Sequence, residues 1–382
     1  MSLCALSLLI WLYLLLFHGR FWHADQRLFD ATTTIKKWPD VCAVIPARNE
    51  EMTIRRTVRS LLDQDYPGKL SIIVVNDNSE DATADEARVA TVDSVEGKRL
   101  IVIDGQPLIE GWVGKIWAVS QGIEHAGSPK YLLLTDADIE HETKSVRNLV
   151  SKAESDNLGL VSEMVLLNCT SLWEKLLIPA FVYFFQKLYP FPQINDPDHQ
   201  LAGAAGGCML VRREDLVAAG GIERIKDRVI DDCSLAAIIK PIRPIWLGLS
   251  EHTKSIRPYN NLSSIWGMVT RTAYVQLRFN PLMLIGTVLS MVLIYLLPIA
   301  GLILGALTTD IQLMLISGSA WIAMWWTILP TLDLYDRSSV WGLLLPVSGF
   351  LFTLMTLDSA RRYYQGQGGA WKGRTYSPST KS

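Results

Sequence analysis

The sequence predicts an α/β domain with a parallel sheet, flanked by hydrophobic helices near both ends of the chain. Between residues 39 and 258, short apolar runs alternate with amphipathic stretches, a pattern typical of strands covered by helices on both faces. Uncharged apolar runs at either end are long enough to cross a bilayer. The 382 residues leave room for one domain of about 200–250 residues beside those runs.

The first apolar run, Ser2–Phe17, predicts an N-terminal transmembrane anchor within residues 1–20. A signal peptide is the alternative, but no basic segment precedes the run and no small-residue cleavage site follows it. We therefore expect an uncleaved anchor. Basic residues come next, and the positive-inside rule then places the following domain in the cytoplasm. These residues are Arg20, Arg27, Lys36 and Lys37.

Continuous apolar runs mark the expected strands of the central domain, residues 39–258. They are Val41–Ile45, Leu70–Val75, Leu100–Ile103 and Tyr131–Leu134. Helices are expected after the first two strands, with Asn49 capping the first helix and Asn78 or Ser79 capping the second. Ligands of such sheets bind beyond the carboxyl ends of the strands, so the polar residues there are the candidates for function.

The strongest candidate motif is Asp136-Ala137-Asp138, directly after the strand Tyr131–Leu134. Two carboxylates one residue apart in a strand-end turn can face one metal ion. Hard oxygen ligands suit Mg²⁺ or Mn²⁺, and such an ion can bridge a substrate diphosphate. A solvated turn is the alternative interpretation of this short motif.

The first two strand ends carry candidates for nucleotide binding. Asp77 follows the second strand, where its carboxylate can accept from a uracil N–H or bind a ribose hydroxyl. Pro46 and Glu50 follow the first strand, where the fixed proline φ gives the chain a sharp exit. The sequence lacks the glycine-rich loop of dinucleotide folds and of sugar nucleotidylyltransferases.

Two glycine-containing segments are candidates for contacts with the substrates. Lys115 follows Gly111 and Gly114 at the start of a predicted helix, where a lysine and a helix N-terminus both favour a diphosphate. Gly206 and Gly207 open the apolar stretch Cys208–Val211, and small residues let a substrate lie against the backbone. An exposed turn and a flexible linker are the respective alternatives.

Asp231 and Asp232 begin a predicted helix. Adjacent carboxylates disfavour joint ionisation, so one of them can have a raised pKa and act as a base. The alternative is an acidic first helical turn stabilised by the helix dipole.

The remaining apolar segments predict contact with a membrane. Residues 171–194 mix aromatic and charged side chains and suggest an interfacial amphipathic helix, with a core helix of the soluble domain as the alternative. Within residues 281–358, Pro281–Leu307, Ile311–Leu332 and Val340–Leu357 are each long enough to span a bilayer. Three crossings place the basic tail, residues 359–382, outside, whereas its charge favours the inside. A re-entrant or interfacial position of one run would resolve this conflict.

Composition excludes several classes of protein. The net charge is −2, and the chain as a whole has no excess of basic residues that would suit nucleic acid. The five cysteines are widely spaced without a C-x-x-C pair, which argues against a zinc site or a disulfide framework.

In this order, the motifs resemble glycosyltransferase family 2, whose GT-A fold is a Rossmann-like fold of nucleotide-diphospho-sugar transferases. The matching segments are PARNE at 46–50, NDNS at 76–79, DAD at 136–138, GGCMLVRRE at 206–214 and IDDCSLA at 230–236. A closer resemblance is to the hopene-associated glycosyltransferase subgroup, through GWVGKIWA at 111–118, RTAYVQLRF at 271–279 and WKGRTY at 371–376.

The resemblance implies a role for each matching residue. Asp77 would contact the nucleoside, with Glu50 and Lys115 nearby, and Asp136 and Asp138 would hold the metal and the diphosphate. Asp232 matches the catalytic base, beside Asp231. On the acceptor side, the resemblance points to Gly206, Gly207, Arg271, Gln276 and Arg278.

The expected function is inverting transfer of a sugar from a nucleotide-diphosphate sugar to a membrane lipid. We expect a UDP-sugar as the donor, and the subgroup resemblance points to a hopanoid-related lipid as the acceptor. Gln276–Phe279 only partly resembles the Q-x-x-R-W motif of processive synthases. A processive polysaccharide synthase and a catalytically degenerate membrane scaffold remain the alternatives. We expect an integral protein of the bacterial inner membrane, with its catalytic domain in the cytoplasm and no nucleic-acid partner.

Overall fold

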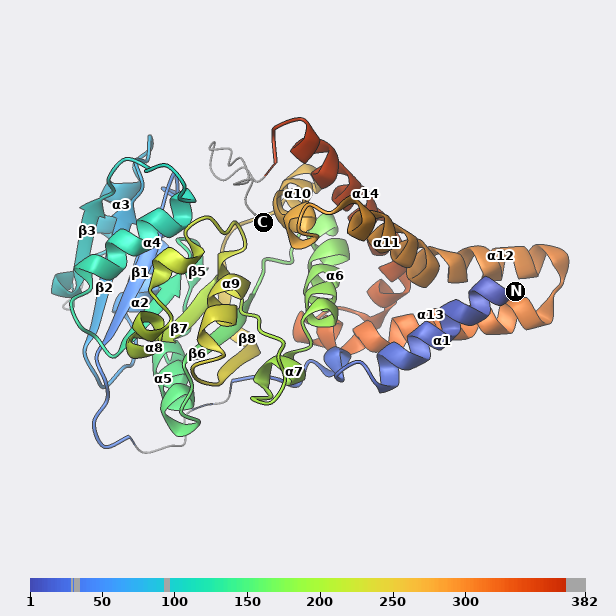
Figure 1. The fold of residues 1–382 in the computed structure, drawn as a ribbon, viewed down its shortest axis with the longest axis horizontal. Coiled ribbons are helices and arrows are strands. Elements are labelled where there is room, and N and C mark those ends of the chain that lie inside the picture. Colours follow the sequence, from blue (N-terminus) through green and yellow to red (C-terminus); the bar gives the residue numbers. More distant parts are fainter. Residues whose placement is uncertain (29, 31–34, 93–96, 369–382) are drawn as a thin grey trace. The chain divides into compact units, whose positions relative to one another are not determined.

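A computed structural model describes residues 1–28, 30, 35–92 and 97–368 (Figure 1). These residues form two compact units. The sheet unit comprises residues 25–168 and 193–257, and the helical unit comprises residues 1–24, 169–192 and 258–368. The segment WKGRTY and the basic residues Lys372, Arg374 and Lys381 lie outside the described residues.

Within the described residues, eight strands form one sheet with the order β3-β2-β1-β4-β7-β6-β8-β5. The strands are β1 (Val41–Ala47), β2 (Leu70–Asn76), β3 (Leu100–Asp104), β4 (Tyr131–Thr135), β5 (Ile139–Glu140), β6 (Leu160–Leu166), β7 (Cys208–Arg212) and β8 (Ile245–Ser255). Strands β3, β2, β1 and β4 are parallel, as expected. The sheet as a whole is mixed, because β7 runs antiparallel to both β4 and β6.

Helices cover both faces of the sheet. They include α2 (Ile54–Leu62), α3 (Thr83–Val89), α4 (Gly114–His125), α5 (Ser145–Ser155), α8 (Arg213–Ala218) and α9 (Asp231–Ile239), with the 3₁₀ turns η2 (Gly97–Arg99) and η3 (Ile222–Ile225). Apolar residues of α2, α3 and α5 share one core with alternate residues of β1 and β2. Helix α4 packs on the opposite face, where Gly122 meets Val44 and Val75.

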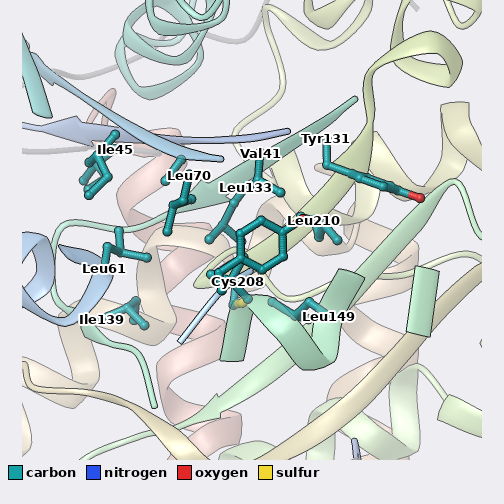
Figure 2. Packing of buried hydrophobic residues seen from close by; sticks show 14 of the residues in the cluster. Val41, Ile45, Leu61, Leu70, Tyr131, Leu133, Ile139, Leu149, Cys208 and Leu210 are labelled. Carbon is teal, nitrogen blue, oxygen red and sulfur yellow. The ribbon is translucent and has the colours of Figure 1, made fainter. Parts of the chain in front are cut away.

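That core lies against the middle strands of the sheet (Figure 2). Val41 and Ile45 of β1, Leu70 of β2 and Leu61 of α2 belong to this core, and all four side chains are fully buried. The strands are rigid where they enter the core, so the loops at their carboxyl ends begin from well-defined positions.

The predicted helix caps are wrong. Helix α2 begins after Thr53 and helix α3 after Ala82, and neither Asn49 nor Asn78 is a cap. Both asparagines instead adopt positive φ values, 52° and 53°. Asparagine tolerates this left-handed conformation better than most residues, so the same residue type serves a turn here rather than a helix start.

The helical unit contains the apolar segments. Its elements are α1 (Ser2–Leu16), η1 (Phe21–His23), α6 (Leu172–Leu188), α10 (Leu262–Gln276), α11 (Pro281–Met291), the π-helical η4 (Val292–Leu296), α12 (Leu297–Thr308), α13 (Ile311–Leu334), η5 (Ser339–Leu344) and α14 (Leu345–Tyr364). Among the described residues, three segments are long and apolar enough to cross a membrane: Pro281–Thr308, Ile311–Leu334 and Ser339–Tyr364.

The N-terminal helix is shorter than these segments. Helix α1 has 15 residues, which corresponds to about 22 Å at the α-helical rise. The hydrocarbon core of a bilayer is about 30 Å thick. The role of helix α1 as a spanning anchor stays a prediction.

The aromatic segment 171–194 forms a helix and a short extension. Ser171 and Glu174 make a capping box at the start of α6, and the helix ends at Leu188, before Pro190. The short helix α7 (Phe191–Asn195) follows. Leu177 and Tyr183 of α6 pack into the core of the helical unit, together with Trp11 and Tyr295. The expected position of segment 171–194 at a membrane surface stays a prediction.

Substitution of Gly122 would test the packing of α4 on the sheet. A Cβ atom at this position would lie 2.4 Å from Cγ1 of Val44. We expect Gly122→Ala to destabilise the sheet unit by about 1–3 kcal/mol, because the packed core has to shift. Glu124→Ala, on an exposed position of the same helix, should change stability by less than about 0.5 kcal/mol. Denaturant unfolding of the full chain measures both, and equal midpoints for the two variants would contradict this packing.

Candidate active site

Lys115 lies at the centre of the candidate site, in the first turn of α4. Its Nζ is 2.8 Å from Oδ1 of Asp136 and 3.0 Å from Oδ2 of Asp231. Burial lowers the pKa of Lys115, but the charges of Asp136, Asp231 and Asp232 raise this pKa by more, so the ammonium stays charged. Through these two ion pairs, the Lys115 ammonium links the end of β4 to the start of α9.

Asp232 has the environment of a base. The backbone N–H of Gly206 donates to its Oδ2 at 3.0 Å, and the N–H of Cys233 donates to its Oδ1 at 2.7 Å. Burial, and then the neighbouring charge of Asp231, raise the pKa of Asp232 to about 6. A Cβ atom at Gly206 would lie 3.4 Å from both this carboxylate and Nζ of Lys115, so glycine leaves the space between them open.

A second group of charges holds the other acidic candidates. Nε of Arg257 is 2.6 Å from Oδ2 of Asp138, and its Nη2 is 2.5 Å from Oε1 of Glu50. The carboxylate side chains are only 10% and 11% exposed. Burial raises the pKa of Asp138 and Arg257 opposes that rise, while Asp136 and Glu50 add to it.

The donor set of the two groups fits a divalent cation that is shared with a diphosphate. Within the described residues, no group of three or more His, Cys, Asp or Glu side chains is arranged to hold a metal. Magnesium sites commonly use one or two protein carboxylates and take their remaining oxygens from substrate phosphates and water. Asp136 and Asp138 supply such a pair. Five carboxylates surround Lys115 and Arg257, and this excess of negative charge favours a cation.

A pocket brings residues from separate strand ends together. It is lined by Pro46, Lys115, Asp136, Gly206 and Asp231, with apolar side chains from α4, β4, β7 and α9. These five residues were candidates from the sequence, whereas the candidates Glu50, Asp138 and Asp232 do not line this pocket.

Asp77 and Gly207 do not line this pocket either. Asp77 follows β2, is 1% exposed, and its N–H donates to the carbonyl of Ala47. Arg48 donates to the Asp77 carbonyl at 2.7 Å, which ties the ends of β1 and β2 together. The carbonyl of Gly207 accepts from Oγ1 of Thr135. A nucleoside contact by Asp77 stays a prediction.

Sequence reasoning missed Arg257 and His141. Arg257 comes two residues after β8, a strand that begins with the short apolar stretch 245–249 but continues with mostly polar and charged residues to Ser255. His141 lies 2.9 Å from Oγ1 of Thr135, and burial lowers the pKa of this imidazole to about 4. The neutral ring therefore hydrogen-bonds to the hydroxyl of Thr135, the residue before Asp136. Polar residues after the carboxyl ends of strands were the candidates for function, so Arg257 would have been one of them if β8 had been recognised as a strand.

The remaining candidates belong to the helical unit. Arg271 and Gln276 lie in α10, and Nε2 of Gln276 donates to the Tyr189 hydroxyl at 2.6 Å. Arg278 follows the helix with a φ of 52°. Their acceptor-side roles stay predictions.

Arg257 provides a test of the second charge group. Arg257→Gln should lower the free energy of unfolding by about 1–3 kcal/mol, less than for a fully buried pair because this side chain is 32% exposed. Adding Glu50→Gln should restore part of the loss, since it removes one carboxylate that Arg257 pairs. Thermal unfolding of the two single variants and the double variant measures this coupling. Strictly additive effects would show that the pair does not interact.

Known proteins share parts of this sequence. A probable glycosyltransferase of Bacillus subtilis, YdaM, is 41% identical over 85 residues, which are 20% of this chain and 20% of that protein. The 4,4'-diaponeurosporenoate glycosyltransferase of Staphylococcus aureus is 28% identical over 202 residues, which are 51% of this chain and 49% of that protein. The chain thus spans half or less of the length of these relatives.

A solved structure shares the fold. The mannosyltransferase PcManGT of Pyrobaculum calidifontis, in complex with GDP-Man and Mn²⁺, aligns with a TM-score of 0.54 and 18% identity. The alignment covers 94% of this chain and 97% of that one. The sequence model of "Glycosyl transferase family 2" matches residues 42–218, which contain most of the sheet unit. Residues 42–218 thus match glycosyl transferase family 2, and the sheet unit has the GT-A fold.

Proposed function

We propose that the chain transfers a sugar from a nucleotide-diphosphate sugar to a membrane lipid, with inversion at the anomeric carbon. The observation that carries this proposal is the gathering of Asp136, Asp231 and Asp232 around Lys115 at the strand ends. Such a site offers carboxylates for a cation, an ammonium for a phosphate and a base for an acceptor hydroxyl. A UDP-sugar is the donor that we propose.

Asp232 acts as the base in this mechanism. With a pKa of about 6, most of its carboxyl is ionised at pH 7 and can accept the proton of the acceptor hydroxyl. The acceptor oxygen attacks the anomeric carbon while the bond to the diphosphate breaks, and one displacement inverts that carbon. Lys115 is placed to offset the charge on the departing diphosphate.

Asp136 and Asp138 would hold Mg²⁺ or Mn²⁺. When bound, the ion supplies Lewis-acid stabilisation of the diphosphate leaving group. Glu50 and Arg257 keep Asp138 oriented, and we propose that Asp77 contacts the nucleoside from the end of the neighbouring strand.

A discrete lipid is the acceptor class that we propose. The S. aureus relative is named for one defined acceptor, 4,4'-diaponeurosporenoate, which favours a single product over a polymer. The three candidate spans support a location in a membrane, which we propose is the bacterial inner membrane with the sheet unit on the cytoplasmic side. The subgroup resemblance makes a hopanoid-related lipid the first acceptor to test.

Incubation of the full chain in lipid nanodiscs with single UDP-sugars, Mn²⁺ and a bacterial lipid extract tests this function. Mass spectrometry should show one sugar added per lipid. A ladder of products would indicate a processive synthase, and no transfer with any donor would contradict the proposal. Lipids of a deletion strain, compared with those of its parent, identify the acceptor.

Asp232→Asn should lower kcat by about 10²–10⁴-fold, the usual contribution of a general base. Donor binding should change little, because Asp136, Asp138 and Lys115 are retained. In the unmodified protein, kcat/KM should fall as the pH drops below about 6, since the protonated carboxyl can no longer accept a proton. Asp85→Asn, at an exposed position of helix α3, is the control. Full turnover by the Asp232 variant would exclude this residue as the base.

Removal of divalent cations with EDTA should abolish transfer, and Mn²⁺ or Mg²⁺ should restore it. Asp136→Asn and Asp138→Asn should each raise the metal concentration needed for half-maximal activity by at least about tenfold, because each removes one anionic ligand. The measurement is initial rate against free metal concentration. Activity that is unchanged in EDTA would show that no metal takes part.

A further inference from the structure

His141 is a buried residue directly after β5 that the proposed mechanism does not use, and it is only 4% exposed. Its backbone N–H donates to Oγ of Ser60 at 3.0 Å, which ties this part of the chain to helix α2. Ring atom Nε2 lies 2.9 Å from Oγ1 of Thr135, and ring atom Nδ1 lies 3.4 Å from Oγ of Ser145. The imidazole therefore bridges the last residue of β4 and the first residue of α5.

The hydrogen bonds around the ring determine which ring nitrogen carries the proton. The Thr135 hydroxyl donates to the carbonyl of Gly207 at 2.8 Å, and this carbonyl can only accept. Because a hydroxyl has one hydrogen, Oγ1 of Thr135 can only accept from the imidazole. Nε2 of His141 is thus the N–H, and Nδ1 keeps a lone pair that can accept from the Ser145 hydroxyl. Burial lowers the pKa of the ring to about 4, so the ring is neutral at pH 7.

The Thr135 hydroxyl connects this ring to the turn that holds the proposed base. Gly207 follows Gly206, whose N–H donates to Oδ2 of Asp232 at 3.0 Å. Glycines have no side chains to anchor such a turn, so its position depends on contacts with backbone atoms. Ser162 holds the residues before and after the glycine pair, and Thr135 holds the carbonyl of Gly207 itself.

We propose that His141 is a positioning residue for the candidate site. Its Nε2–H directs the hydrogen of the Thr135 hydroxyl onto Gly207, and this contact keeps the N–H of Gly206 on Asp232. With the proton on Nδ1 instead, Nε2 would need the threonine hydrogen, and the Gly207 carbonyl would lose its donor. This role rests on the proposed function, because Asp232 is a base only in that mechanism.

Solid-state ¹⁵N NMR of the full chain, with labelled histidine and in lipid bilayers, tests the tautomer without any donor sugar. The signals that are absent from the His141→Gln variant identify this ring among the six histidines. We expect a neutral ring with its proton on Nε2 throughout about pH 6–8. A proton on Nδ1, or a charged ring at pH 7, would overturn the proposal. A chain that transfers no sugar would contradict the proposed function, and the NMR result would still decide the arrangement of the ring.

Two amide variants separate the contributions of the two ring nitrogens. The amide N–H of His141→Gln can replace Nε2–H, so kcat should stay close to that of the unmodified protein. His141→Asn places its amide nearer the position of Nδ1 and leaves Thr135 without its donor. It should lower kcat by about tenfold or more at an unchanged KM for the donor, because misplacement of a reacting group is costly. Its kcat/KM should also begin to fall at a higher pH, since the N–H of Gly206 lowers the pKa of Asp232.

Thr135 supplies a matched test of the same contact. Thr135→Val keeps the shape of the side chain without the hydroxyl and should reproduce both effects of His141→Asn, whereas Thr135→Ser should not. Combining Thr135→Val with His141→Asn should add little, because both variants remove one contact. Circular dichroism of each variant checks that its helices are intact. Equal kcat for the glutamine and asparagine variants, or an unshifted pH profile in His141→Asn and Thr135→Val, would overturn the positioning role.

Discussion

The charge of Lys115 is the constraint on which the candidate site depends. Asp136, Asp231 and Asp232 come from the end of β4 and the start of α9, and without a cation their carboxylates repel one another. The lysine is rooted in α4, which packs closely on β1 and β2 through Gly122. The backbone position of Lys115 is therefore fixed by this packing, and its ammonium pairs with carboxylates from the end of β4 and the start of α9. The same density of negative charge that requires the lysine also makes the site suitable for a divalent metal.

Much of the sheet unit was predictable, because buried parallel strands have a strong local signal. The apolar runs that predicted β1, β2 and β4 were each one or two residues too short at their carboxyl ends. The helix caps were not predictable in the same way. Oδ1 of Asn49 accepts from the N–H of Glu80, a contact across 31 positions that secures two loops. Local propensity does not distinguish that use of asparagine from a helix cap.

Some residues of the candidate site were likewise predictable from local sequence, and others were not. Asp136, Asp138 and Asp232 stood out because acidic pairs next to strands or helix starts are informative by themselves. Arg257 did not, because its importance arises only when β8 carries it to Glu50 and Asp138, more than a hundred residues away in sequence. The antiparallel direction of β7 was equally hidden, since strand direction is set by pairing and not by composition. Local patterns thus identified the acids, whereas the fold supplied their partners.

The order of strands also bears on how the protein is made. Strand β8 lies between β6 and β5, although it is the last of them in the chain. A nascent chain that has not yet reached Ile245 leaves one edge of β6 open and β5 without its only pairing strand among the described residues. Unpaired edges of this kind invite association with other chains. Premature termination before Ile245 should consequently yield aggregating fragments rather than a smaller, soluble domain.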